Sequence, residues 1–252
     1  MRMLTMHGCF VLTMGLYAVS AHAAIIFNDD FESGLNTTDI NQPNYWHPRF
    51  GSNVVPGLTT DQSVSPTHSM LNNNNPGGNN QWFAYVPLQA TPTFYDLWVR
   101  NDHTQTGFQT EDVVIWNKGG TGYSEGVALR RTAGEPNFRY RANGANFVDT
   151  GIPYNTGTWY HIGFDMDPTT SKFDLYISTT EAFGAPVASG VSYVGGDGVG
   201  RLFFYSDSAK PLYYIDNVKI TAIPEPQSVA LLACAAGLLL MSRHRRGGVL
   251  RL

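Results

Sequence analysis

The stretch that decides the fold class is Thr158-Trp159-Tyr160-His161-Ile162-Gly163-Phe164-Asp165-Met166-Asp167, followed after the turn at 168–171 by Lys172-Phe173-Asp174-Leu175-Tyr176-Ile177. In both segments large apolar side chains alternate with polar or small ones, a pattern typical of strands with one buried face. The four residues between them, Pro-Thr-Thr-Ser, favour a turn. The two segments therefore predict an antiparallel hairpin in which Met166 pairs with Phe173 and Asp165 lies opposite Asp174.

The same alternation recurs in short runs between positions 25 and 220, separated by Gly, Asn, Asp and Pro. No segment there has helical periodicity over more than about two turns. Two stacked sheets bury apolar faces that a single sheet would leave in water. We therefore expect an all-β protein, a two-sheet antiparallel β-sandwich, with loops dominating 36–80. Further strands are expected at 25–31, 82–88, 94–100, 112–117, 127–131, 137–142, 191–194, 201–206 and 213–221.

Composition narrows the choice of partners. Charged residues make up 14% of the 252 residues, against about 25% in an average soluble domain. Positions 24–223 hold 11 basic and 19 acidic residues, a formal charge of −8. Nucleic acid is not expected as a partner, because its binding depends on concentrated positive charge. Both cysteines, Cys9 and Cys234, lie in the end segments, so no disulfide or cysteine metal site is expected between them.

The first 23 residues have the layout of a secretory signal peptide. Arg2 gives a basic start, an apolar run covers 9–19, and Ala21-His22-Ala23 supplies small residues at a cleavage site. We expect a signal helix that is cleaved between Ala23 and Ala24, so that the folded domain is exported.

The C-terminal segment, 223–252, combines three parts. Pro224-Glu225-Pro226 comes first, an apolar helix is expected over 228–242, and Arg243, Arg245 and Arg246 follow it. The 13 apolar residues at 229–241 would span roughly 20 Å as a helix, less than the roughly 30 Å of a bilayer core. By length alone this segment could therefore also be a helix buried in a protein core. The arginine cluster favours a membrane helix with a cytoplasmic C-terminus and an outward-facing domain.

This order of parts resembles the PEP-CTERM sorting signal of Gram-negative bacteria. The resemblance implies a membrane-embedded exosortase as processing partner and an association with exopolysaccharide and biofilm. It also implies transient anchoring in the inner membrane facing the periplasm, followed by release to the cell surface or extracellular matrix. The tail 247–252 departs from the family, whose members usually end soon after the arginines.

The central domain, 24–222, resembles laminin-G-like and concanavalin A-like jelly rolls. The resemblance lies in Asn28-Asp29-Asp30-Phe31-Glu32-Ser33-Gly34, Gly157-Thr158-Trp159-Tyr160-His161-Ile162 and Ile215-Asp216-Asn217-Val218. Galactose-binding sandwiches open and close similarly and rank second.

The jelly-roll resemblance also implies that the first and last strands pair, which would bring Asp30 and Glu32 near Asp216. Carboxylate oxygens suit Ca²⁺, so a structural calcium site at these three residues is a hypothesis. Ordinary turn and strand-end carboxylates are the alternative.

Two further sets of residues are candidate glycan sites. Asp165 and Asp174 lie about 5 Å apart across the predicted hairpin, close to the carboxyl spacing of retaining glycosidases, although residues flanking a tight turn are usually solvated. The second set contains aromatic side chains for sugar rings and arginines for uronates; its alternative is core aromatics and solubilising arginines. It consists of Trp116, Tyr123, Arg139 and Arg141.

No enzyme pattern is present. The sequence lacks the Glu-x-Asp-x-x-Glu strand of jelly-roll glucanases and the combination of Arg-rich, Gln-x-His and Tyr-rich strands of jelly-roll alginate lyases. It also lacks the His-Glu-x-x-His and Gly-x-Ser-x-Gly patterns. We therefore expect a non-catalytic cell-surface or matrix protein that binds exopolysaccharide. The alternative is a divergent glycan-cleaving enzyme, a glycosidase or lyase, on the same scaffold.

Overall fold

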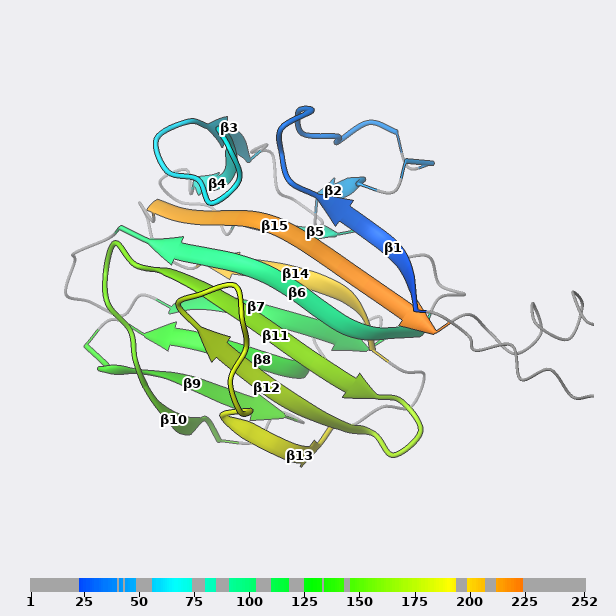
Figure 1. The fold of residues 1–252 in the computed structure, drawn as a ribbon, viewed down its shortest axis with the longest axis vertical. Helices are drawn as coiled ribbons and strands as arrows, with labels where there is room; N and C mark the ends of the chain where they lie inside the picture. The colour runs from blue at the N-terminus through cyan, green and yellow to red at the C-terminus, as the bar shows by residue number, and fades with distance from the viewer. Residues whose placement is uncertain are drawn as a thin grey trace, which may run out of the picture.

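The structure is a computed structural model (Figure 1). It describes residues 23–39, 41–42, 44–48, 56–73, 80–84, 91–102, 110–117, 125–132, 134–142, 146–193, 199–206 and 212–223. The sorting motif Pro224-Glu225-Pro226, the arginines after it, and the signal peptide before Ala23 lie outside the described residues. No described residue is helical, so no helix in this part of the chain could cross a membrane.

Fifteen strands form the described part of the domain. They are β1 (Ala24–Asp29), β2 (Trp46–Pro48), β3 (Gly57–Thr59), β4 (Ser69–Asn73), β5 (Asn80–Ala84), β6 (Thr91–Asn101), β7 (Thr110–Asn117), β8 (Glu125–Thr132), β9 (Asn137–Ala142), β10 (Val148–Pro153), β11 (Trp159–Asp167), β12 (Lys172–Ser178), β13 (Ala188–Ser192), β14 (Val199–Ser206) and β15 (Leu212–Ile223).

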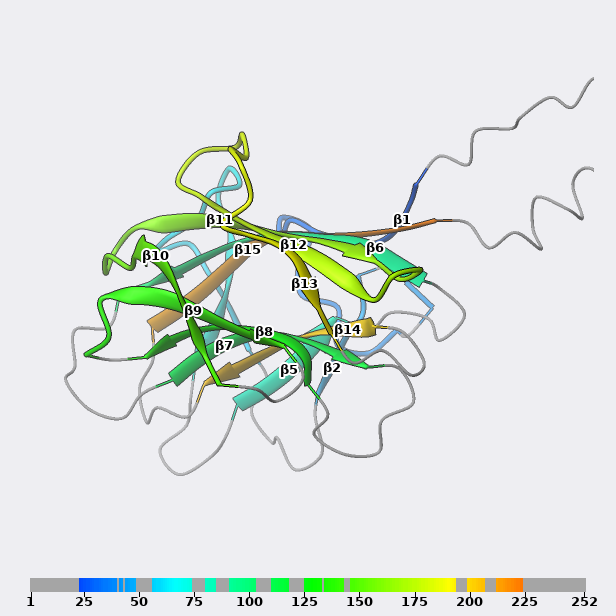
Figure 2. The same cartoon turned by 90° about the horizontal axis from the view of Figure 1, so that it is seen from below.

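The strands make two antiparallel sheets stacked face to face, as Figure 2 shows. The first sheet has the order β13-β12-β11-β6-β15-β4-β3, and β1 also pairs with β15. The second sheet has the order β10-β9-β8-β7-β14-β5-β2. The predicted all-β jelly-roll sandwich is confirmed, including the pairing of the first and last strands.

The hairpin β11–β12 has the predicted register. Met166 pairs with Phe173, Asp165 with Asp174, and Gly163 with Tyr176. Burial of the alternating apolar positions explains this precision, because a slip of one residue would turn every core side chain toward water. On its other edge β11 pairs with β6, and β12 pairs with the edge strand β13, so the hairpin is paired on both sides.

The core lies between the two inner faces. Each large side chain buried there contributes roughly 1.5 to 3 kcal/mol relative to exposure. The first sheet supplies Tyr95, Leu97, Val99, Tyr160, Ile162, Phe164, Met166, Phe173, Leu175, Ile215, Val218 and Ile220, and the second supplies Trp46, Ala84, Val113, Ile115, Val127, Leu129, Phe138, Leu202 and Phe204.

The structure differs from the sequence-based prediction in two places. The region 36–80, expected to be loop, contains β2, β3 and β4. β10 was not predicted at all. The strands β2, β3, β4 and β10 are all short. The edge strand β10 is also exposed and has no alternating apolar pattern, and its Val148 is 49% exposed. Backbone pairing with a neighbouring strand, rather than hydrophobic periodicity, defines these segments.

Candidate functional site

Three arginines gather on the outer face of the second sheet. Arg130 on β8 pairs directly with Arg139 on β9, and Arg141 lies two residues further along β9. Their neighbours Leu129 and Phe138 point into the core, so strand alternation places the arginines on the opposite side. Arg139 and Arg141, two residues apart on β9, share this face. We call this surface the arginine face.

Phe147, just before β10, organises the arginine face. The guanidinium carbon of Arg130 lies 4.1 Å from the centre of its ring, and that of Arg141 lies 4.6 Å from it. Arg139 donates a hydrogen bond of 3.0 Å from Nη2 to the Phe147 carbonyl and lies 3.4 Å from Glu135. The ring itself packs on a small apolar floor made of Val114, Ala128 and Phe203. Two guanidinium groups therefore lie over one aromatic ring, and a third is bonded to the backbone of the same residue.

Strand register extends the arginine face across the sheet. Arg130 stands opposite Asp112 on β7, Asp112 stands opposite Tyr205 on β14, and Tyr205 stands opposite Gln81 on β5. We call these positions, together with Arg139, the arginine row.

Of the residues predicted for sugar binding, Arg139 and Arg141 are thus brought together. Trp116 lies on β7 in register with Arg201 and Glu125, two residues along the strand from Val114, which is part of the floor under Phe147. Tyr123 lies outside the described residues. Phe147 was missed, because no local pattern around it marks a contact with arginines on two other strands.

The outer face of the first sheet carries acidic and aromatic side chains instead. His161 on β11 is only 6% exposed and stacks between Trp98 (4.6 Å between ring centres) and Phe183 (4.0 Å). Its Nε2 lies 2.5 Å from Oδ1 of Asp96, and its Nδ1 lies 3.3 Å from the carbonyl of Thr180. Phe183 covers the histidine, so the pair is closed to a large ligand as it stands.

The carboxylate pair Asp165 and Asp174 lies beside this cluster. Partial burial raises the pKa of Asp165, and the negative charges of Asp174 and Asp167 raise it further. Asp174 accepts hydrogen bonds from the Ser189 hydroxyl (2.8 Å) and the Gly190 amide (2.7 Å). Two neighbouring carboxyl groups in different surroundings are a common arrangement for acid and base roles.

The predicted calcium ligands are partly brought together. The Ser65 hydroxyl lies 3.0 Å from Glu32 and 3.1 Å from Asp216, which links the two carboxylates. Asp30 instead accepts the amide of Glu32 within its own turn. Among the residues the structure describes, no group of three or more His, Cys, Asp or Glu side chains is placed to hold a metal ion.

The donors around these carboxylates do not fit a cation. Oδ2 of Asp216 accepts the amides of Val64 (2.6 Å) and Ser65 (2.9 Å), and its Oδ1 accepts the amide of Asn217. Glu32 accepts the amides of Thr67 and His68 and the Thr67 hydroxyl. These bonds, led by the Thr67 hydroxyl, hold the pKa of Glu32 well below its usual range. Their lone pairs are already engaged by protein donors, which take the place that Ca²⁺ would have.

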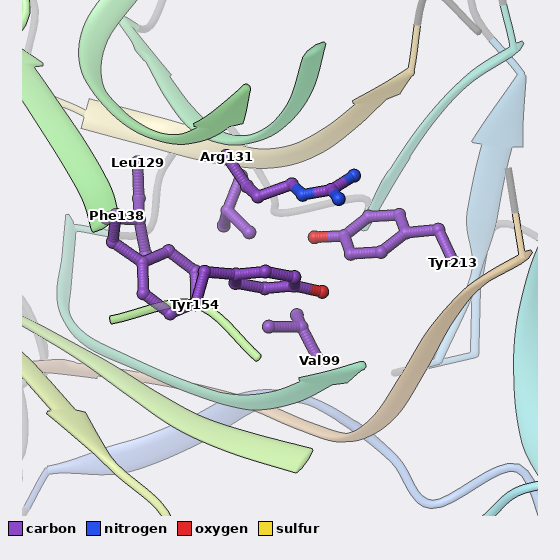
Figure 3. A pocket seen from close by; sticks show the side chains of 7 residues that line it. Val99, Leu129, Arg131, Phe138, Tyr154 and Tyr213 are labelled. Atoms are coloured by element: carbon purple, nitrogen blue, oxygen red, sulfur yellow. The ribbon is translucent and has the colours of Figure 1, made fainter. Parts of the chain in front are cut away.

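A small cavity lies between the sheets, lined by Arg131, Tyr154 and Tyr213 with four apolar side chains (Figure 3). The guanidinium carbon of Arg131 lies 4.9 Å from the centre of the Tyr154 ring. The cavity volume is about 10 Å³, close to the space of one water. It is too small for a sugar ring.

Comparison with known proteins gives similar folds only. No protein-family model and no curated protein matches the sequence. A solved catalytic domain of a glycoside hydrolase family 131 protein from Coprinopsis cinerea is similar with a TM-score of 0.57 and 14% identity, over 80% of this chain and 95% of that one. An endo-beta-1,4-glucuronan lyase from the fungus Trichoderma reesei has a TM-score of 0.52 and 14% identity, over 74% and 94%.

A sialidase is also similar, with a TM-score of 0.54 and 14% identity over 80% of this chain. The match spans only 18% of the sialidase chain, so the likeness concerns one part of that protein. At these identities the comparisons show a shared fold.

The comparisons contradict the expectation of a non-catalytic protein, because the three similar structures carry the names of carbohydrate-active enzymes. The expectation depended on missing motifs. Such motifs belong to single families, whereas one scaffold carries many sites built from unrelated residues. The absence of known patterns was therefore weak evidence against an enzyme.

Proposed function

We propose that this protein is a glycan-cleaving enzyme and that its substrate lies on the arginine face. The observation that carries the proposal is the grouping of Arg130, Arg139 and Arg141 around Phe147. The enzymes named above, which share this fold, support the class of activity.

The arginine face suits a polysaccharide for physical reasons. Its arginines stand on strands of a continuous sheet, which hold functional groups more precisely than loops do. A guanidinium presents several N–H donors in one plane and binds carboxylates or paired oxygens in a bidentate manner. Arg130 and Arg139 lie directly opposite each other, and Arg139 also pairs with Glu135.

A second candidate site is the pair Asp165 and Asp174 on the other outer face. The two carboxylates face each other across β11–β12, and the raised pKa of Asp165 suits a general acid. Phe183, in the connection between β12 and β13, covers part of this face, and Asp174 accepts hydrogen bonds from Ser189 and Gly190. The arginine face is therefore the better supported site.

The test is the release of new reducing ends from neutral and acidic polysaccharides by the purified full-length protein. We expect release by the wild type and a loss of about tenfold or more in the double variant Arg139→Gln/Arg141→Gln. The matched control is Lys172→Gln/Lys219→Gln, which removes the same charge from the first sheet and should keep full activity. No reducing ends from any polysaccharide would overturn the proposal. Loss of activity in Asp165→Asn but not in the arginine variant would move the site to the other face.

We also propose that the enzyme works outside the cytoplasm. The signal peptide ending at Ala23, the motif Pro224-Glu225-Pro226, and the cluster Arg243, Arg245 and Arg246 support export and sorting. The expected route is anchoring in the inner membrane of a Gram-negative bacterium, processing by an exosortase, and release to the cell surface or matrix. The test is the intact mass and location of the protein in cells with and without the exosortase. An identical C-terminus and location in both strains would contradict the sorting proposal.

A further inference from the structure

We propose that the connection between β12 and β13, residues 179–187, is a lid held closed by a proton shared between His161 and Asp96. Loss of this proton to water releases the lid and uncovers part of the outer face of β6 and β11. The lid lies on the first sheet and the arginine face on the second, so this proposal and the proposed function can fail separately.

The connection 179–187 contacts His161 in two ways. The Phe183 ring packs on Gly163 and stacks on the imidazole, with 4.0 Å between the two ring centres. The Thr180 carbonyl lies 3.3 Å from Nδ1 of His161. The neighbours of Phe183 in the chain, residues 181–182 and 184–185, are exposed. A residue of the sheet therefore touches the covering segment through both its ring face and a ring nitrogen.

Both ring nitrogens of His161 face oxygen atoms. Nδ1 faces the Thr180 carbonyl, which only accepts hydrogen bonds, and Nε2 lies 2.5 Å from Oδ1 of Asp96. A neutral imidazole carries one N–H, whereas an imidazolium carries two. Both contacts are hydrogen bonds only when Nδ1 has its proton and a second proton lies between Nε2 and the carboxyl group, on either atom. The closed arrangement thus holds one proton more than a neutral histidine beside a carboxylate.

Opening is the way in which the protein accommodates the loss of this proton. His161 is 6% exposed and its ring lies between those of Trp98 and Phe183. With one proton fewer, either the Asp96 carboxylate or the Thr180 carbonyl loses its donor, which is unfavourable for a buried group. Asp96 stands within the sheet, in register with residues of β11 and β15. Thr180 belongs to an exposed connection, so its carbonyl regains a hydrogen bond from water when the connection moves outward and lifts Phe183 from Gly163.

Other titratable groups on the surrounding elements have to be separated from this pair. Arg100 is bonded to Asp102, and Asp174 accepts from Ser189 and Gly190. Burial raises the pKa of Asp165, and the charges of Asp174 and Asp167 raise it further, so the titration of Asp165 needs its own control. The charged and titratable residues on the elements around His161 are Asp96 and Arg100 on β6, Asp165 on β11, Asp174 and Tyr176 on β12, Glu181 in the connection, and Asp216 and Lys219 on β15.

The extra proton fixes the direction of the pH dependence. The closed form binds this proton and the open form releases it, so low pH favours closure and rising pH favours opening. Histidine changes its charge between about pH 5 and pH 8, and we expect the connection to open across this range. Opening uncovers Trp98 and widens access to the neighbouring carboxylate pair, Asp165 and Asp174, which is the second candidate site.

The experiment is hydroxyl-radical footprinting of the purified full-length protein between about pH 5 and pH 8, read by mass spectrometry. The reporters are Phe183 and Trp98, and the internal reference is Trp46, which is fully buried on the second sheet. The loss of one hydrogen bond shifts the ratio of open to closed forms by roughly two- to tenfold. We therefore expect oxidation of Phe183 and Trp98, relative to Trp46, to rise by a similar factor as the pH rises.

Two variants separate the proton from the contact. In Asp96→Asn the amide donates to Nε2 of a neutral histidine, so Nδ1 keeps its proton for the Thr180 carbonyl. This variant should stay closed at every pH. His161→Phe keeps a stacked ring but has no nitrogen, so Phe183 should be more oxidised than in the wild type at low pH and equally oxidised at every pH. Both variants remove the pH dependence, so either one suffices where the other does not fold.

The matched control is His68→Phe, which removes a histidine from the connection between β3 and β4. It should keep the pH dependence of the wild type. Oxidation of Phe183 that is constant with pH in the wild type, or that falls as the pH rises, would overturn the proposal. So would a pH dependence that persists in Asp96→Asn and His161→Phe, and its loss in Asp165→Asn would then assign the titration to Asp165. None of these measurements uses a polysaccharide, so their outcome is separate from that of the cleavage assay.

Discussion

The ring of Phe183 lies on Gly163, so close that a Cβ atom added to the glycine would be 2.8 Å from Cζ of Phe183. Phe183 belongs to residues 179–187, which connect β12 to β13 and which we call the strap. Its ring also lies 6.1 Å from that of Phe94 and 5.4 Å from that of Tyr176. Because Gly163 has no side chain, the Phe183 ring can pack directly on it and hold the strap against the first sheet.

Substitution of Gly163 by alanine should displace the strap. The new methyl group overlaps Phe183, and overpacking of this kind costs roughly 1 to 3 kcal/mol, which lowers the melting midpoint by roughly 2 to 10 °C for a domain of this size. The matched control is Gly184→Ala in the strap itself, where an added Cβ meets nothing within 4 Å. Equal midpoints of Gly163→Ala and Gly184→Ala would contradict the anchoring role.

The pair His161 and Asp96 should be coupled energetically. His161→Phe keeps an aromatic ring between Trp98 and Phe183 but removes the ring nitrogens that lie beside the Asp96 carboxylate and the Thr180 carbonyl. A lost partner of this kind costs roughly 1 to 3 kcal/mol. The double variant His161→Phe/Asp96→Leu should recover part of this loss, as measured by urea unfolding in a double-mutant cycle. Strict additivity of the two single changes would show that the bond has no energetic weight.

Sequence patterns predicted the hairpin β11–β12 to the residue because its apolar positions alternate within one short segment. They did not predict β10, whose exposed residues carry no such signal. The arginine face was predicted only in part. Arg139 and Arg141 lie two positions apart on one strand, so the sequence shows them together, whereas Phe147 lies outside that strand and contacts them only in the folded protein. The packing of Phe183 on Gly163 is a contact between residues that are 20 positions apart in the sequence, and only the tertiary structure reveals it.

Asp29 should make the stability of the domain depend on pH. The residue is 3% exposed, and burial raises its pKa to about 6, although hydrogen bonds from Trp46 (2.6 Å) and the Phe31 amide oppose the rise. The folded state therefore binds the proton more tightly than the unfolded state does, whose value is 3.8. This group's contribution is fully present below about pH 4 and is lost as the pH rises to about 6, by up to roughly 3 kcal/mol.

The measurement is urea unfolding between pH 4 and pH 7 for the wild type and Asp29→Asn. The asparagine does not titrate, so the difference in unfolding free energy between the two proteins should change across this window and level off above about pH 6. Other ionisable groups cancel in this difference. A difference that stays constant from pH 4 to pH 7 would show that Asp29 titrates normally.

Calcium should leave thermal stability unchanged. The carboxylates of Glu32 and Asp216, two of the ligands expected from the sequence, already accept bonds from backbone amides and hydroxyls, and a metal would have to displace them. We expect melting midpoints in calcium and in a chelator to agree within about 1 °C. A ligand at 100 times its Kd would stabilise the fold by about 2.7 kcal/mol, so a shift of several degrees with calcium and not with magnesium would restore the predicted site.

Phe147 should matter more for glycan cleavage than for folding. Phe147→Leu keeps an apolar side chain on the floor made by Val114, Ala128 and Phe203, so the melting midpoint should fall by only about 2 to 4 °C, as for other volume-conserving changes. The variant removes the aromatic face that restrains Arg130 and Arg141. Each of the two cation–π contacts at this partly exposed site is worth about 0.5 to 1 kcal/mol, which predicts a fall of roughly five- to thirtyfold in kcat/KM on the cleaved polysaccharide. The control is Phe183→Leu in the strap, which packs on the other sheet; this change should lower the melting midpoint and leave kcat/KM unchanged. Equal loss of activity in both variants would mean that general stability, rather than the arginine arrangement, sets the rate.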